Sequence, residues 1–191
     1  MEFTKIRLSK QGTLVATYKN NDGDTVNFVG ANVVHKDMRE AMKALVPHLA
    51  LLTEQREAYG KTLADLRAQS ITDEGDNAYK RLSVDCVSFS DKENKVAIGG
   101  TRILTKAGII TISTSVTDLE DTEAYEGVNE LAVDIDAVKY EAEQYITNKK
   151  WGVVQASIEF ADIDPFNGVK AEDAPEVEAP KKKSKKTKKV A

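Results

Sequence analysis

The stretch from Arg81 to Val116, RLSVDCVSFSDKENKVAIGGTRILTKAGIITISTSV, is the part of the chain whose composition most clearly predicts a folded core. It contains three runs rich in β-branched and aromatic residues, which we expect to form strands at Leu82–Phe89, Lys95–Leu104 and Ile109–Val116. The segments SDKEN and TKAG between these runs have the composition of turns. An antiparallel meander is therefore predicted at the centre of the fold.

Two irregularities are expected within this meander. The alternation of apolar residues that begins at Leu82 is broken at Phe89, which indicates a β-bulge near Cys86–Val87. The pair Gly99–Gly100 indicates a further bulge or a close approach of another backbone. A phosphate-binding loop is the alternative for this pair, and it is disfavoured because the Gly-x-x-x-x-Gly-Lys-Ser/Thr pattern is missing.

The N-terminal segment from Phe3 to Gly30 alternates apolar and polar residues and is predicted to form three further strands. Gln11–Gly12 and Asp22–Gly23 are expected at the two turns, since glycine accepts the positive φ that tight turns require. The order of three strands, a helix and more strands is similar to that of the OB-fold, a partly open barrel that binds single-stranded nucleic acid. The likeness lies in element order alone.

A helical region follows these strands. Asp37 and Glu40 have the spacing of a capping box, and apolar residues then recur at helical spacing as far as Leu52. Pro47 interrupts this pattern, so that either the helix kinks there or a second helix begins with the proline in its first turn. Helix is expected to resume after Gly60, and a loop is expected from residue 69 to residue 77.

The last part of the domain allows two interpretations. Leu131 to Ile135 has the alternation of a short strand, with Asp136 capping a short helix that follows, but a single helix from Val128 also fits the spacing. Trp151–Phe160 is predicted to be a final strand. From position 168 onward the chain has almost no large apolar residues, which is typical of disorder.

These patterns predict the fold class and the domain boundaries. We expect an α+β domain at residues 1–164, built on an antiparallel sheet with one long or kinked helix and one short C-terminal helix, with a partly open barrel as the alternative. Residues 165–191 are expected to be a disordered tail, acidic in its first half and lysine-rich in its second. No signal peptide is recognisable, and no apolar run is long enough to cross a membrane. A cytoplasmic location is therefore predicted, or a nuclear one in a eukaryotic host.

Charge is divided unevenly along the chain. The formal net charge is -4, and seven lysines near the C-terminus leave residues 1–180 with a charge of -11. The lysines are Lys181, Lys182, Lys183, Lys185, Lys186, Lys188 and Lys189. An acidic body repels a polyanion unless its positive groups gather on one face, whereas a lysine run contacts phosphates without reading bases.

Catalytic motifs are weak in this sequence. The two histidines, His35 and His48, and the single cysteine, Cys86, are interpreted as structural residues, because their spacing matches no zinc site or nucleophilic centre. Asp134 with Asp136, and Asp162 with Asp164, place carboxylates two residues apart, which on a strand would share a face and bind Mg²⁺. A magnesium-dependent phosphodiester hydrolase is therefore an alternative, and no cofactor is predicted otherwise.

A second positive surface is predicted on the strands. Lys5, Arg7 and Lys19 share the outward parity of the first hairpin, while Arg102 and Lys106 lie near the end of the central one. Aromatic residues near such a surface can stack on bases, and the nearest are Tyr79 and Tyr18, the latter with the parity of the core.

Together these features favour a non-enzymatic accessory protein that binds nucleic acid through the lysine-rich tail and the basic hairpin face. The expected ligand is DNA, in particular single-stranded DNA, and it is expected to be bound with little sequence specificity. The alternative from another class is a protein-interaction or assembly component, which acts through its acidic surface, including by self-association. For the lysines alone, the simplest interpretation is a solvated tail that only aids solubility.

Overall fold

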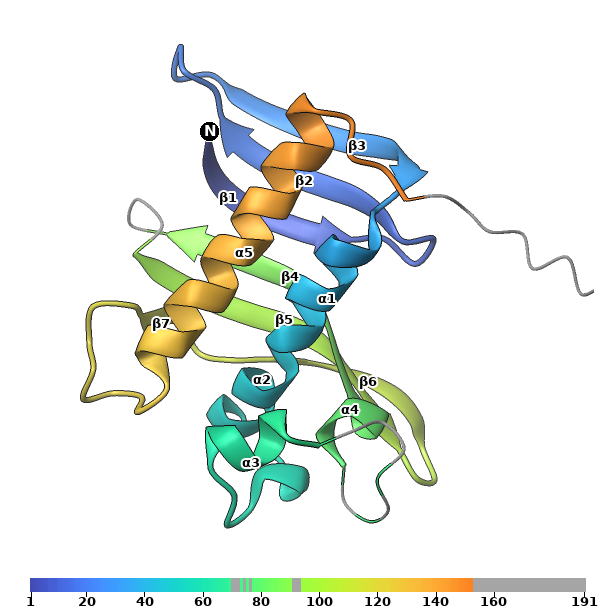
Figure 1. Cartoon of the computed structure of the whole chain (residues 1–191), viewed down its shortest axis with the longest axis vertical. Helices are drawn as coiled ribbons and strands as arrows, with labels where there is room; N and C mark the ends of the chain where they lie inside the picture. The colour runs from blue at the N-terminus through green and yellow to red at the C-terminus, as the bar shows by residue number, and fades with distance from the viewer. Residues whose placement is uncertain (70–72, 74, 76, 91–93, 153–191) are drawn as a thin grey trace, which may run out of the picture. The chain divides into compact units, whose positions relative to one another are not determined.

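The computed structural model describes residues 1–69, 73, 75, 77–90 and 94–152, and its centre is a seven-stranded sheet (Figure 1). The strands pair antiparallel in the order β3-β2-β1-β4-β5-β6, and β7 pairs with the first two residues of β5, Lys95 and Val96. They are β1 (Glu2–Leu8), β2 (Thr13–Lys19), β3 (Thr25–Val33), β4 (Leu82–Ser90), β5 (Lys95–Leu104), β6 (Gly108–Ser113) and β7 (Thr117–Asp118). The expected α+β class is confirmed, and the sheet is open rather than a closed barrel.

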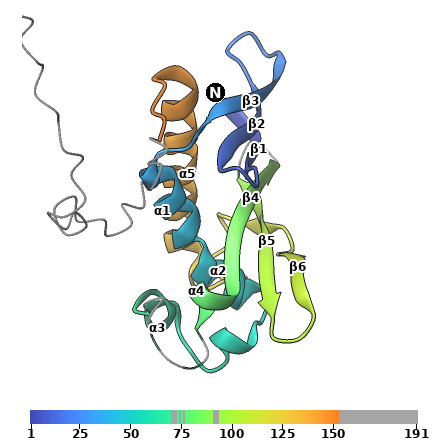
Figure 2. The same cartoon turned by 90° about the vertical axis from the view of Figure 1, so that its right-hand side faces the viewer.

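Helices cover one face of this sheet and leave the other face uncovered within the described part of the chain (Figure 2). The helices are α1 (Lys36–Ala44), α2 (Val46–Leu52), α3 (Leu63–Arg67), α4 (Ala78–Arg81) and α5 (Val128–Thr147), with a 3-10 turn, η1, at Arg56–Ala58. None of the described helices is both long and apolar enough to cross a membrane.

The hydrophobic core lies between the sheet and the helices α1, α2 and α5. Alternate residues of the strands point into it, as the period-two pattern predicts, and meet the apolar stripes of the helices. Fully buried members include Ile6, Leu14, Met38, Met42, Leu49, Ile98, Leu131 and Ile135. The helices therefore fix one face of the sheet in the interior and leave the side chains of opposite parity on the other face.

The helical segments refine the expectations drawn from the sequence. The side chain of His35 caps α1 by accepting a hydrogen bond from the amide of Asp37, so the expected capping box of Asp37 and Glu40 is wrong. Pro47 lies in the first turn of a separate helix, α2. This confirms the interpretation of a second helix that begins with the proline in its first turn.

The chain between residues 128 and 147 forms the single helix α5, which confirms the interpretation of one helix from Val128, whereas the alternative of a strand at Leu131–Ile135 is wrong. Trp151 forms only an isolated bridge with Val34. The remainder of the expected last strand, residues 153–160, and the expected tail at 165–191 lie outside the described residues.

The expected bulge is present, because the register of β4 against β5 shifts between Val84 and Cys86. Of the glycine pair opposite this bulge, Gly100 is the residue that allows the backbones of β4 and β5 to approach closely. A β-carbon built at Gly100 would overlap the carbonyl oxygen of Ser83, whereas one built at Gly99 would lie 3.4 Å from the β-carbon of Cys86, an ordinary contact distance.

Substitution of Gly100 by alanine is expected to lower the free energy of unfolding by about 1 to 3 kcal/mol, because β4 and β5 would have to separate. Chemical denaturation of Gly100→Ala beside Gly99→Ala measures the difference, and the second variant serves as the matched control. Equal stability of the two variants would contradict the close approach.

Candidate nucleic-acid interface

The uncovered face of the sheet carries a groove of about 790 Å³. Its walls come from β1, β4, β5 and β6 and from the turn after β1. The lining residues are Lys5, Arg7, Leu8, Ser9, Lys10, Asp85, Cys86, Gly99, Gly100, Thr101, Ile109, Thr111, Ile112 and Ser113. Hydroxyl groups, small residues and basic side chains therefore dominate this surface, which we call the open face.

Lys5 and Arg7 lie in the middle of the open face because of the strand order. They alternate with the buried Ile6 on β1, which is a central strand between β2 and β4. The antiparallel register places Lys5 opposite Ser88 and Arg7 opposite Cys86. Both basic side chains are exposed, and their neighbours across the strands are uncharged.

One carboxylate shares the groove with these cations. Partial burial raises the pKa of Asp85 above its usual range, and the nearby charge of Arg7 opposes this shift. Lys5, Arg7 and Lys10 outnumber Asp85 among the charged groups that line the groove. The groove is thus locally cationic on a body whose net charge is strongly negative.

The other basic residues singled out from the sequence are placed differently. Lys19 ends β2 and lies 3.7 Å from a carboxylate oxygen of Glu2, with both side chains about half exposed. Lys106 is exposed in the turn between β5 and β6. The seven tail lysines, Lys181, Lys182, Lys183, Lys185, Lys186, Lys188 and Lys189, lie outside the described residues.

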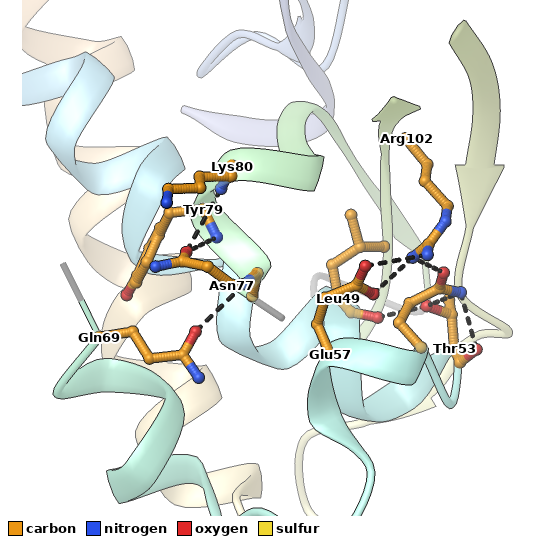
Figure 3. Close-up of polar contacts among 10 residues, drawn as sticks. Leu49, Thr53, Glu57, Gln69, Asn77, Tyr79, Lys80 and Arg102 are labelled. Atoms are coloured by element: carbon orange, nitrogen blue, oxygen red, sulfur yellow. Dashed lines mark hydrogen bonds and ion pairs between the residues drawn. The ribbon is translucent and has the colours of Figure 1, made fainter. Parts of the chain in front are cut away.

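Arg102 is turned away from the open face and is held in an ion pair (Figure 3). Its two terminal nitrogens donate to the carboxylate of Glu57 at 2.7 and 2.9 Å, and one of them also donates to Gln55. The side chain of Glu57 is only 3% exposed and that of Arg102 is 17% exposed. The structure therefore separates Arg102 from Lys5 and Arg7, and it gives Arg102 the role of fixing η1 against β5.

Neither of the two candidate aromatic residues lies on the open face. Tyr18 is buried and packs edge to face against Phe3, as its parity predicts. Tyr79 lies on α4 with the ammonium group of Lys43 over its ring, and burial raises the pKa of its hydroxyl. The described lining of the groove contains no aromatic ring, and its apolar contact area comes from aliphatic groups such as Ile109.

A buried polar cluster lies elsewhere, on the helical side, and no sequence pattern indicated it. His48 is fully buried on α2, with one ring nitrogen 2.8 Å from the hydroxyl of Tyr125 and the other 3.1 Å from Asp134. Arg67 donates to the same carboxylate oxygen at 2.7 Å. Burial raises the pKa of Tyr125 to about 12, so its hydroxyl keeps its proton. The cluster ties α2, α3 and α5 together.

The acid pairs do not form a metal site in the described part of the chain. Asp134 and Asp136 lie on a helix rather than a strand, so their side chains diverge, and Asp136 faces Lys139 at 3.5 Å instead. No three His, Cys, Asp or Glu side chains within the described ranges gather as metal ligands would. Asp162 and Asp164 lie outside those ranges.

Comparison with family models, with curated proteins and with solved structures found no match to this chain.

Proposed function

We propose that this protein is a non-enzymatic accessory factor that binds nucleic acid, DNA in preference, with little sequence specificity and along the open face of its sheet. The observation that carries the proposal is the position of Lys5 and Arg7 in the middle of an uncovered groove lined with hydroxyl groups. Phosphate oxygens accept hydrogen bonds from such lysine, arginine, serine and threonine side chains. The lysine run at the C-terminus provides a second, tethered contact with the phosphates.

The lining of the groove favours a single strand. It includes Gly99, which has no side chain, so a flexible strand can lie close to the sheet and bring its bases against aliphatic groups such as Ile109. With no aromatic ring in the described lining, stacking contributes little, and affinity depends mainly on phosphate contacts. Binding of this kind falls steeply with salt and discriminates weakly between sequences.

The ion pair of Arg102 excludes this residue from the proposed interface, and the salt bridge of Lys19 is found at the edge of the interface. Arg102 does not belong to it, because its guanidinium is occupied by Glu57 on the other side of the sheet. Lys19 and Lys106 lie at the margins of the open face and add to the long-range attraction of a polyanion.

Loss of the two central cations is expected to weaken binding of a labelled single-stranded oligonucleotide and to make its salt dependence shallower. Lys5→Gln with Arg7→Gln removes two phosphate contacts, so the slope of log K against log salt falls in magnitude by about 1.4. Fluorescence anisotropy across a salt series measures both quantities on the full chain.

The matched control removes two lysines from α1, on the helical side, as Lys36→Gln with Lys43→Gln. The same change in net charge is expected to leave the slope unaltered and to reduce affinity only slightly. If both double variants behave alike, the open face is not the binding surface.

A further inference from the structure

The strand β6 ends the sheet, and among the described residues none pairs with its outer edge (Figure 1). Its side chains are unusually exposed for an apolar strand, with Ile109 68% and Ile110 41% accessible. Residues 107–116, AGIITISTSV, contain no charged residue and no proline. Soluble proteins commonly protect edge strands with lysine, proline or a covering element, and this edge has none of the three within the described chain.

The register shows which backbone groups are free on this edge. The amide of Thr114 donates to the carbonyl of Ile98 on β5, so the backbone of Thr114 faces inward. Backbone groups alternate in direction along a strand, so the groups of Ile109, Thr111 and Ser113 face outward. Three amides and three carbonyls are therefore arranged to accept another strand.

We propose that β6 pairs antiparallel with β6 of a second copy of this chain, about a two-fold axis that passes beside Thr111. In this register Thr111 lies opposite its own copy and Ile109 lies opposite Ser113, so that all three outward residues on each strand form hydrogen bonds. Ile110 then lies directly across the strands from Ile112 of the second copy. The pairing closes the exposed edge of both copies with their own residues.

A second copy fits this edge better than a charged partner, because the edge is complementary to itself. Two antiparallel copies of residues 107–116 bring no like charges together, and Lys106 falls opposite the uncharged Val116. The two-fold axis is perpendicular to the sheet, so the open faces of the two copies become one continuous surface on the same side. The pairing itself stands whether or not that surface binds nucleic acid.

Disulfide crosslinking of the full chain tests both the pairing and its register. Thr111→Cys, in a Cys86→Ser background that removes the only native thiol, is expected to give a covalent dimer on mild oxidation. The α-carbons of a hydrogen-bonded pair lie about 5.5 Å apart, within the range that a disulfide spans. Ile109→Cys is the control, because its two copies would lie about 14 Å apart along the strand and would not crosslink.

The mass of the unmodified chain, measured by sedimentation at high salt, gives an independent readout. We expect two chains per particle for the natural sequence and one for Thr111→Pro, whose missing amide faces outward and leaves the ladder with β5 intact. A variant with valine at position 111 keeps the amide and should remain a dimer. A monomeric natural chain, a dimer that survives Thr111→Pro in a folded protein, or equal crosslinking at positions 109 and 111 would overturn the proposal.

Discussion

Deletion of residues 181–191 is expected to reduce the salt dependence of single-stranded DNA binding more than any other single change to this chain. The segment carries seven lysines and no acid, and each phosphate contact on a single strand contributes about 0.7 to the slope of log K against log salt. If all seven engage phosphates, the slope becomes shallower by about 5. Affinity at low salt then falls by several orders of magnitude, and titration by fluorescence anisotropy measures both effects.

The matched control replaces the seven lysines with glutamine, which keeps the length of the chain and removes only the charge. Both variants are expected to retain a weaker binding with a shallow slope, supplied by Lys5 and Arg7. A slope that stays the same without the lysines would remove the tail from the proposed function. Complete loss of binding would instead assign the whole interaction to the tail and none of it to the open face.

The largest expected effect on stability comes from the ion pair between Glu57 and Arg102. Replacement of Glu57 by alanine leaves the guanidinium of Arg102 largely buried without its carboxylate. Removing one partner of a buried pair typically lowers the free energy of unfolding by about 3 to 5 kcal/mol. We expect a loss near the lower end of that range, because Gln55 still accepts one hydrogen bond from Arg102. Urea denaturation followed by circular dichroism measures it.

Glu54→Ala is the control for this change, since Glu54 is an exposed acid on the same segment and its loss alters net charge equally. It is expected to change stability by less than about 0.5 kcal/mol. A second comparison replaces both partners, as Glu57→Leu with Arg102→Met, and should recover much of the stability because no charge is then left buried. Similar losses for Glu57→Ala and Glu54→Ala would show that the pair contributes little.

Periodicity predicted most of the sheet correctly, because half-buried strands alternate in a way that a single sequence displays. The bulge beside Cys86 and the close approach at Gly100 were also visible, since a broken alternation and a glycine pair have few other causes in a strand. The segment Leu131–Ile135 was ambiguous for a physical reason. Its apolar residues fit both periods, and only the core formed by α1 and the sheet decides in favour of a helix.

The site was less accessible to sequence reasoning than the fold. Outward parity placed Lys5 and Arg7 on an exposed surface, but the sequence did not show that β1 lies in the middle of the sheet, next to β4. Arg102 was grouped with them because nothing local reveals its partner, Glu57, which lies 45 positions earlier in the chain. Still larger separations, 77 and 86 positions, hid the contacts of His48 with Tyr125 and Asp134.

The most direct test of the central claim is to record amide chemical shifts of the full chain during titration with a short oligothymidylate. The account predicts that the largest shifts among the described residues occur on the open face, at Lys5 and Arg7 and at the neighbouring Thr101 and Thr111, while α5 stays unchanged. Shifts confined to α1 and α5, or to the residues after position 180, would contradict it.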